Sequence, residues 1–130
     1  MDYKLELVTI PVSDVDRAKS FYAEKAGFNV DVDQRVTDEL RFVQITPPGS
    51  ACSIAFGTGL TTPTPGRAQL QIVVDDVHGA RTELLERGID PGDVQEFPWG
   101  WFVFFSDPDG NNWAVQQLPA WAAQQVPAHP

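Results

Sequence analysis

The sequence predicts an α+β fold in which two tandem βαβββ modules form a U-shaped, concave sheet. Three observations predict it: a turn and strand that occur twice, a helix that occurs twice, and strands whose residues alternate in polarity. The segment TPPGSACSIAFG begins at Thr46, and DPDGNNWAVQQL, which begins at Asp107, matches it at a shift of 61 residues. Such a repeated segment indicates an internal duplication.

The first part of each module repeats as well. VSDVDRAKSFY, from Val12, matches VDDVHGARTEL, from Val74, at a shift of 62 residues. A one-residue deletion near Gly27 and Gly88 would convert this shift into the later one. The resulting organisation is a first module at 1–57, a linker at 58–66, a second module at 67–118 and a C-terminal tail at 119–130. We expect the two modules to form one structural domain.

Each module is expected to run strand, helix, then three strands. Residues 5–12 are rich in β-branched and apolar residues and precede Asp14, which suits a helix N-cap, as Asp76 does in the second module. Gly27 and Gly88 are expected to end the two helices. The remaining strands are expected near 28–36, 39–46, 51–57, 94–97, 100–106 and 112–118. The turns TPPG and DPDG separate the last two strands of each module, because proline and glycine favour turns.

Alternation along the strands predicts which side chains face the helices. In the segment from Gln69 to Val74, Leu70 and Ile72 share one side with Val74, so Gln69 and Gln71 are expected on the concave side. The repeat extends this assignment to the other strands. We therefore expect a ligand-binding trough lined by Leu7, Thr9, Phe42, Gln44, Ser53, Gln69, Gln71, Trp99, Trp101, Val103, Phe105, Ala114 and Gln116.

Aromatic and amide groups dominate this expected lining. Aromatic side chains suit a flat or hydrophobic ligand, and a few amides can orient it. The aromatic residues could instead belong to the core or to a dimer interface, and the glutamines could bind water or backbone. Asp107 and Asp109 are expected to shape a turn rather than to act in catalysis. No nucleophile–base or acid–base pair can be assembled from the concave residues, which favours binding over an enzymatic role.

Charge and composition restrict the partners. The chain has 130 residues, a net charge of −9 and one cysteine, Cys52. Because no basic cluster offsets the acidity, nucleic acid and anionic membrane surfaces are poor partners. No stretch reaches the roughly 18 apolar residues of a membrane span, and a single cysteine suits a reducing compartment. We expect a cytoplasmic protein whose partner is a small molecule.

Three segments carry a resemblance to a known family. They are PVSDVDRAKSFYAEKAGF from Pro11, VVDDVHGARTELLERGI from Val73 and FSDPDGNNWAVQQ from Phe105. In their order and duplication they resemble the vicinal oxygen chelate superfamily, which contains glyoxalase I, bleomycin-resistance proteins, fosfomycin-resistance enzymes and extradiol dioxygenases. The resemblance covers nearly all of residues 3–118, and it implies the glyoxalase/bleomycin-resistance/dioxygenase fold.

The metal positions of that family are not preserved in this chain. Where the family has a metal, each module supplies one ligand from its first strand and one from its last, typically His, Glu or Gln. Carried over, the positions fall on Leu7 and Gln69, and on Ser53 or Ala55 and Ala114 or Gln116. Leu and Ala offer no donor, and Ser or Gln alone is a weak divalent ligand. The two histidines, His78 and His129, lie outside the expected strands. We expect neither a metal nor a cofactor.

These observations lead to one expected function and two alternatives. The expected function is metal-free binding of a small apolar or aromatic molecule in the trough, with sequestration of an antibiotic or metabolite, as the resemblance to bleomycin-resistance proteins implies. The resemblance also implies a homodimer, because those proteins build their cavities between two chains. The alternatives are a metal-dependent lyase or isomerase of the glyoxalase type and a module that binds a peptide or partner protein.

Overall fold

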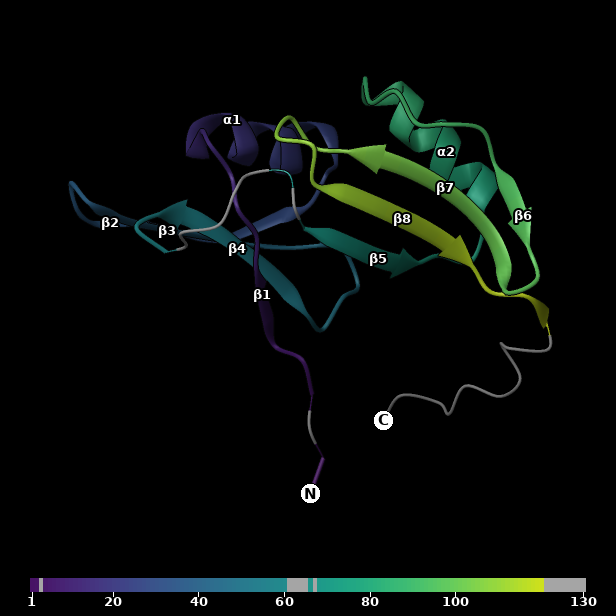
Figure 1. Ribbon diagram of the computed structural model, residues 1–130, viewed down its shortest axis with the longest axis horizontal. Coiled ribbons are helices and arrows are strands. Elements are labelled where there is room, and N and C mark those ends of the chain that lie inside the picture. The colour runs from purple at the N-terminus through teal and green to yellow at the C-terminus, as the bar shows by residue number, and fades with distance from the viewer. Residues whose placement is uncertain (3, 61–65, 67, 121–130) are drawn as a thin grey trace. The chain divides into compact units, whose positions relative to one another are not determined.

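Two four-stranded sheets, one from each half of the chain, form the framework of the computed structural model (Figure 1). The structure describes residues 1–2, 4–60, 66 and 68–120, so most of the expected linker and tail lies outside the described residues. The strand orders are β1-β4-β3-β2 and β5-β8-β7-β6. In each sheet the first strand of the module pairs in parallel with the last. The predicted α+β fold of two tandem βαβββ modules is confirmed.

The first module follows the predicted order. Its elements are β1 (Leu7–Thr9), α1 (Val15–Ser20), a π-helical turn η1 (Phe21–Lys25), β2 (Asn29–Thr37), β3 (Leu40–Thr46) and β4 (Ser53–Thr58). The Asp14 carboxylate caps α1 by accepting a hydrogen bond from the Arg17 backbone N–H. Gly27, at a φ of 75°, follows the helical segment as expected. The first strand is shorter than the apolar run from residue 5 to residue 12 suggested.

The helical segment of this module packs on one face of its sheet. Tyr22 is fully buried, and its ring lies 5.8 Å from that of Phe56 and 6.0 Å from that of Phe28. At the solvent edge Asp33 of β2 joins Arg41 of β3, at 2.9 Å, to Lys19 of α1, at 2.7 Å. The Arg41 guanidinium, and then the Lys19 ammonium, hold the pKa of Asp33 well below its usual range.

The second module repeats this plan. Its elements are β5 (Gln69–Val73), α2 (Val77–Glu86), β6 (Gln95–Phe97), β7 (Gly100–Ser106) and β8 (Asn112–Gln117). The Asp76 carboxylate caps α2 through the backbone N–H groups of His78 and Gly79, and the side-chain carbonyl oxygen of Gln117 accepts a further hydrogen bond from the Val77 N–H at 2.9 Å. Neither this helix nor any other described one is long and apolar enough to cross a membrane.

Backbone proximity divides the chain into two units. The first comprises Met1–Ala68 together with Ser106–Asn111, and the second comprises Gln69–Phe105 and Asn112–Pro130. The DPDG turn between β7 and β8 therefore belongs to the unit built by the first module. A trough shared by the two sheets stays a prediction.

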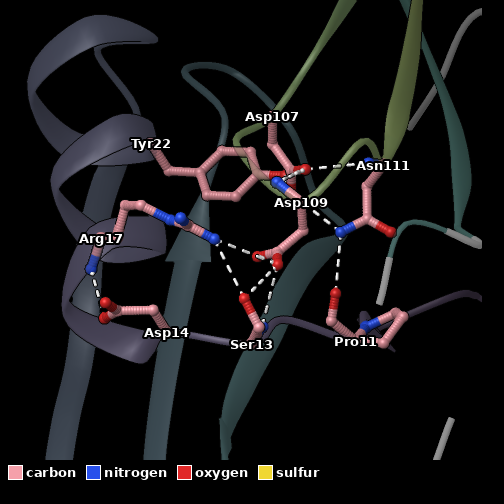
Figure 2. A network of polar contacts seen from close by, with 8 residues as sticks. All are labelled: Pro11, Ser13, Asp14, Arg17, Tyr22, Asp107, Asp109 and Asn111. Carbon is pink, nitrogen blue, oxygen red and sulfur yellow. Dashed lines mark hydrogen bonds and ion pairs between the residues drawn. The ribbon is translucent and has the colours of Figure 1, made fainter. Parts of the chain in front are cut away.

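Asp107 organises the DPDG turn (Figure 2). Its Oδ1 accepts hydrogen bonds from the backbone N–H groups of Asp109, at 2.9 Å, and Asn111, at 2.8 Å. Its Oδ2 accepts from the Tyr22 hydroxyl and from the Asn111 amide, both at 2.8 Å. Gly110 closes the turn with a φ of 86°. The expected turn is confirmed, and the Asp107 carboxylate is occupied by its hydrogen bonds.

The same turn is attached to the start of α1 (Figure 2). The Asn111 amide donates to the Pro11 carbonyl oxygen at 2.8 Å. Asp109 Oδ1 accepts from the Ser13 backbone N–H at 3.1 Å and from the Arg17 guanidinium at 3.2 Å. Both aspartates therefore support the fold, which agrees with the structural interpretation of DPDG.

Candidate functional site

A hollow of about 430 Å³ opens on one face of the second sheet. Asn112 and Ala114 of β8 line it, whereas their neighbour Val115 is buried and the Gln117 side chain caps α2. Successive side chains of a strand point to opposite faces, so the hollow lies on the face away from α2. Its lining residues are Gln69, Leu70, Gln71, Phe97, Trp99, Phe102, Phe104, Asn112, Trp113 and Ala114.

Four rings form a continuous aromatic wall along this hollow: Phe97, Trp99, Phe102 and Phe104. Phe97 stacks on Trp99, with centroids 5.6 Å apart and planes 8° apart, and meets Phe102 edge-on at 5.5 Å. Phe102 in turn stacks on Phe104 at 5.8 Å. Trp99 is 56% exposed and Phe104 is 40% exposed. The aromatic wall therefore offers accessible ring faces on which a flat apolar molecule can stack.

Amide groups lie beside the aromatic wall. Gln71 and Ala114 are register partners on β5 and β8, as are Gln69 and Asn112. Gln71 donates a 2.6 Å hydrogen bond from its Nε2 to Oε1 of Gln116, and Gln116 donates from its own Nε2 to the Trp99 carbonyl oxygen at 3.0 Å. Gln116 is only 7% exposed. It connects the sheet to the loop that carries Trp99.

None of the ten lining residues is charged. An ionic ligand placed in the hollow would lose hydration without gaining a charged partner, which is unfavourable. The chemistry that the hollow offers is therefore stacking, apolar burial and hydrogen bonding to neutral amides.

Four of the predicted residues of the second module line the hollow: Gln69, Gln71, Trp99 and Ala114. Gln116 lies on the same face of β8 and bonds to Gln71. The face assignment for β5 and β8 thus agrees with the structure, and a ligand-binding role for these residues stays a prediction.

The face assignment for β7 was wrong. Phe105 stacks on Trp113 at 5.8 Å and an interplanar angle of 7°, and Val103 is fully buried. Trp101 shares their side of the strand, and none of the three is among the residues that line the hollow. Their places are taken by Phe102 and Phe104. Sequence reasoning missed these two and four further lining residues, which are Leu70, Phe97, Asn112 and Trp113.

The cause of this error is a register difference between the modules. β3 spans Leu40–Thr46 and β7 spans Gly100–Ser106, so these corresponding strands are offset by 60 positions. The turn sequences that follow them, TPPG and DPDG, are offset by 61 positions. Because side chains alternate with a period of two, one position moves every side chain to the other face. The signal that could have revealed it is the short hairpin after β6, in which Phe97 pairs with Gly100.

In the first module the predicted residues lie on the face away from α1. Val43 and Ile45 pair with Phe56 and Ile54, which form the core on the helix side. The predicted residues alternate with these core residues on β1, β3 and β4, and they are Leu7, Thr9, Phe42, Gln44 and Ser53. Their role in binding a ligand also stays a prediction.

Ser53 is buried and engaged with its neighbours. Its hydroxyl is hydrogen-bonded to that of Thr46, and the Thr46 hydroxyl also bonds to the Asp31 carboxylate. The hydrogen bond from Thr46 is the main cause that lowers the pKa of Asp31 below its usual value. Asp31, Thr46 and Ser53 therefore form a polar cluster on this sheet, in contrast to the aromatic wall of the second.

The residues at the family's metal positions do not fit a divalent ion. Leu7, Ala55 and Ala114 have no ligand atom in their side chains, and Gln69 offers only a neutral amide oxygen, which is a weak divalent ligand by itself. Ser53 is bonded to Thr46, and Gln116 uses both ends of its amide on Gln71 and Trp99. Across the part of the chain that the structure describes, no group of three or more His, Cys, Asp or Glu side chains could hold a metal ion. The donor chemistry at these positions therefore gives no basis for a metal-dependent step.

The two tandem βαβββ modules define a fold of the vicinal oxygen chelate type, and the second module carries an uncharged hollow on its sheet. The chain belongs to the Glyoxalase/Bleomycin resistance protein/Dioxygenase superfamily, whose family profile matches residues 4–115. The resemblance carried by the sequence motifs is thereby confirmed.

Several known proteins are similar to this chain. TnmS3, an antibiotic binding protein from Streptomyces sp. CB03234, is 34% identical with a TM-score of 0.81, covering 91% of this chain and 98% of that one. A glyoxalase/bleomycin resistance protein from the same strain is 36% identical with a TM-score of 0.76, covering 88% and 100%. The uncharacterized protein YetH of Bacillus subtilis (strain 168) is 26% identical, covering 85% of this chain and 94% of that one.

Proposed function

We propose that the protein binds a small, flat, apolar or aromatic molecule in the hollow of the second sheet, without a metal, and so sequesters an antibiotic or metabolite. The observation that carries this proposal is the stacked aromatic wall, with Trp99 and Phe104 still exposed, beside neutral amides. Exposed aromatic rings are unfavourably hydrated, so a ligand that covers them and removes their surface from water binds favourably. The similarity to TnmS3, an antibiotic binding protein, supports the same interpretation.

The composition of the lining supports binding without chemical conversion. The ten residues around the hollow contain no carboxylate, histidine, lysine, cysteine or hydroxyl side chain. General acid–base and nucleophilic catalysis both require such groups. A lyase or isomerase of the glyoxalase type would also need metal ligands, and the residues at those positions do not fit them.

The proposal includes a homodimer in the cytoplasm. The support for a dimer is the likeness to bleomycin-resistance proteins, which build cavities between two chains. The support for the cytoplasm is the single cysteine, Cys52, which suits a reducing compartment.

Native mass spectrometry of the purified protein tests these points together. We expect a dimer mass, no stoichiometric metal, and an added mass when the neutral fluorophore N-phenyl-1-naphthylamine is supplied. Stoichiometric zinc, nickel or iron, combined with a chelator-sensitive lyase or isomerase activity, would instead establish the enzyme. Capture of peptides with no uptake of small aromatic molecules would establish the interaction module.

A further inference from the structure

We infer that Gln71 accepts a hydrogen bond from the ligand through its Oε1, and that Gln116 is the positioning residue that turns the Gln71 amide into this orientation. The ligand class that follows is a neutral aromatic molecule with an N–H or O–H group at its edge. The inference rests on the proposed function and deepens it.

The orientation of Gln116 is determined by the backbone. Its amide lies 3.0 Å from the Trp99 carbonyl oxygen, which can only accept hydrogen bonds. Gln116 must therefore direct its Nε2 to Trp99 and its Oε1 to the opposite side. Because Gln116 is buried at 7% exposure, it has little room to rotate away from this arrangement.

The orientation of Gln116 determines that of Gln71. The atom of Gln71 that lies 2.6 Å from Gln116 Oε1 must be a donor, and only Nε2 can donate. Reversing the Gln71 amide would place two carbonyl oxygens against each other. Gln71 thus presents its Oε1 away from Gln116.

That oxygen is available to a ligand. Gln71 lines the hollow, and its Oε1 accepts no hydrogen bond from another residue within the described ranges 4–60 and 68–120. Its register partner on β8 is Ala114, whose methyl group leaves the space beside the amide open. An acceptor fixed next to the aromatic wall favours a ligand whose ring edge carries a donor.

The lack of charge in the lining of the hollow restricts the ligand class further. The lining residues provide no cation to bind an anionic group and no carboxylate to bind a cationic one. A neutral donor such as an arylamine N–H or a phenol O–H matches Gln71 Oε1 without the cost of burying an unpaired charge.

A matched pair of fluorescent probes tests the inference on the full chain. N-phenyl-1-naphthylamine carries one N–H donor, and N-methyl-N-phenyl-1-naphthylamine has the same rings without it. We expect the wild-type protein to bind the N–H probe about fivefold more tightly, which is the size of one net hydrogen bond. In Gln71→Met this preference should disappear, and in Gln95→Met, the matched control at an exposed glutamine of β6 outside the lining of the hollow, it should remain.

Two substitutions of Gln116 separate positioning from packing. Gln116→Met removes the acceptor for Gln71 Nε2, so the Gln71 amide can rotate. The ratio of the affinities for the two probes should then fall toward one. Gln116→Glu can replace both hydrogen bonds only when its carboxyl is protonated, because the O–H then donates to the Trp99 carbonyl while the other oxygen accepts from Gln71 Nε2. The preference should therefore be lost in this variant at neutral pH and return as the pH falls, and a preference that stays lost at acidic pH would argue against positioning by Gln116. If Gln116→Met does not fold, the Gln71→Met comparison carries the test by itself.

The outcomes distinguish the inference from the proposed function. Equal binding of both probes to the wild type, with Phe104→Ala weakening both, would overturn the role of Gln71 while the proposed function stands. Binding of neither probe, or binding that Phe104→Ala leaves unchanged, would overturn the proposed function and this inference with it. A preference that survives in Gln71→Met would also overturn the inference.

Discussion

Tyr22 donates a 2.8 Å hydrogen bond to the carboxylate of Asp107, which lies 85 residues further along the chain, and both side chains are buried. Tyr22 belongs to the π-helical turn of the first module, and Asp107 begins the turn between β7 and β8. The same carboxylate orders the turn through Asp109 and Asn111. This bond therefore joins the helical segment of the first module to the turn between β7 and β8.

Tyr22→Phe removes the hydroxyl and leaves the buried Asp107 carboxylate without one of its donors. We expect the free energy of unfolding to fall by about 1–3 kcal/mol, the cost of losing a hydrogen bond to a charged group. Urea denaturation measures it. The cost should shrink in an Asp107→Asn background, and an equal cost in both backgrounds would show that the hydroxyl acts elsewhere.

The ion pairs of Asp33 predict how stability depends on pH. Because Arg41 and Lys19 lower the pKa of Asp33 from its ordinary value of 3.8, the folded state binds fewer protons than the unfolded state as the pH falls below that value. The stabilisation is therefore fully present above the unfolded pKa and is lost as the pH falls toward the folded pKa. Asp33→Asn should cost ~1 kcal/mol at neutral pH, an amount discounted for solvent screening.

Urea denaturation of both proteins from neutral pH down into the acid range measures this effect. The difference between wild type and Asp33→Asn should narrow as the pH falls. Asp38→Asn in the adjacent turn is the control, since none of the described residues forms an ion pair with its side chain. A difference that stays constant across the whole pH range would contradict the assignment.

The two faces of β7 should respond differently to truncation. Phe104→Ala removes an exposed ring of the aromatic wall, so we expect N-phenyl-1-naphthylamine to bind about tenfold more weakly, with little change in stability. Trp101→Ala removes a ring from the other face and should leave the affinity unchanged while it lowers the melting temperature. Fluorescence titration and thermal denaturation measure the two effects. The reverse pattern would place Trp101 in the hollow.

Gly100 allows β7 to begin close to β8. A Cβ at this position would lie 2.3 Å from the Gln117 carbonyl oxygen, and the φ of 134° is one that other residues rarely adopt. Gly100→Ala should therefore cost about 1–3 kcal/mol and weaken probe binding, because Trp99 precedes it directly. Gly92→Ala is the matched control, since a Cβ there meets nothing within 4 Å. Equal effects of the two substitutions in urea denaturation would argue against a close approach at Gly100.

Local chemistry made several features predictable from the chain. Asp14 and Asp76 cap helices because their short carboxylates reach the first free N–H groups, whatever the rest of the fold. In β5 the glutamines alternate with Leu70 and Ile72, so only one register buries the apolar side. The duplication itself predicted the order of strands and helices.

Residue chemistry and alternating polarity were thus enough to establish the tandem modules, the caps, the turns and the faces of β5 and β8. Which rings of β7 line the hollow depends on the folded chain. That strand is apolar on both faces, from Trp101 to Phe105, so burial does not favour either register. The register of β7 is determined by its pairing with β6 and by the stacking of Phe105 on Trp113. The bond from Gln116 to the Trp99 carbonyl likewise joins a strand and a loop that meet only after folding.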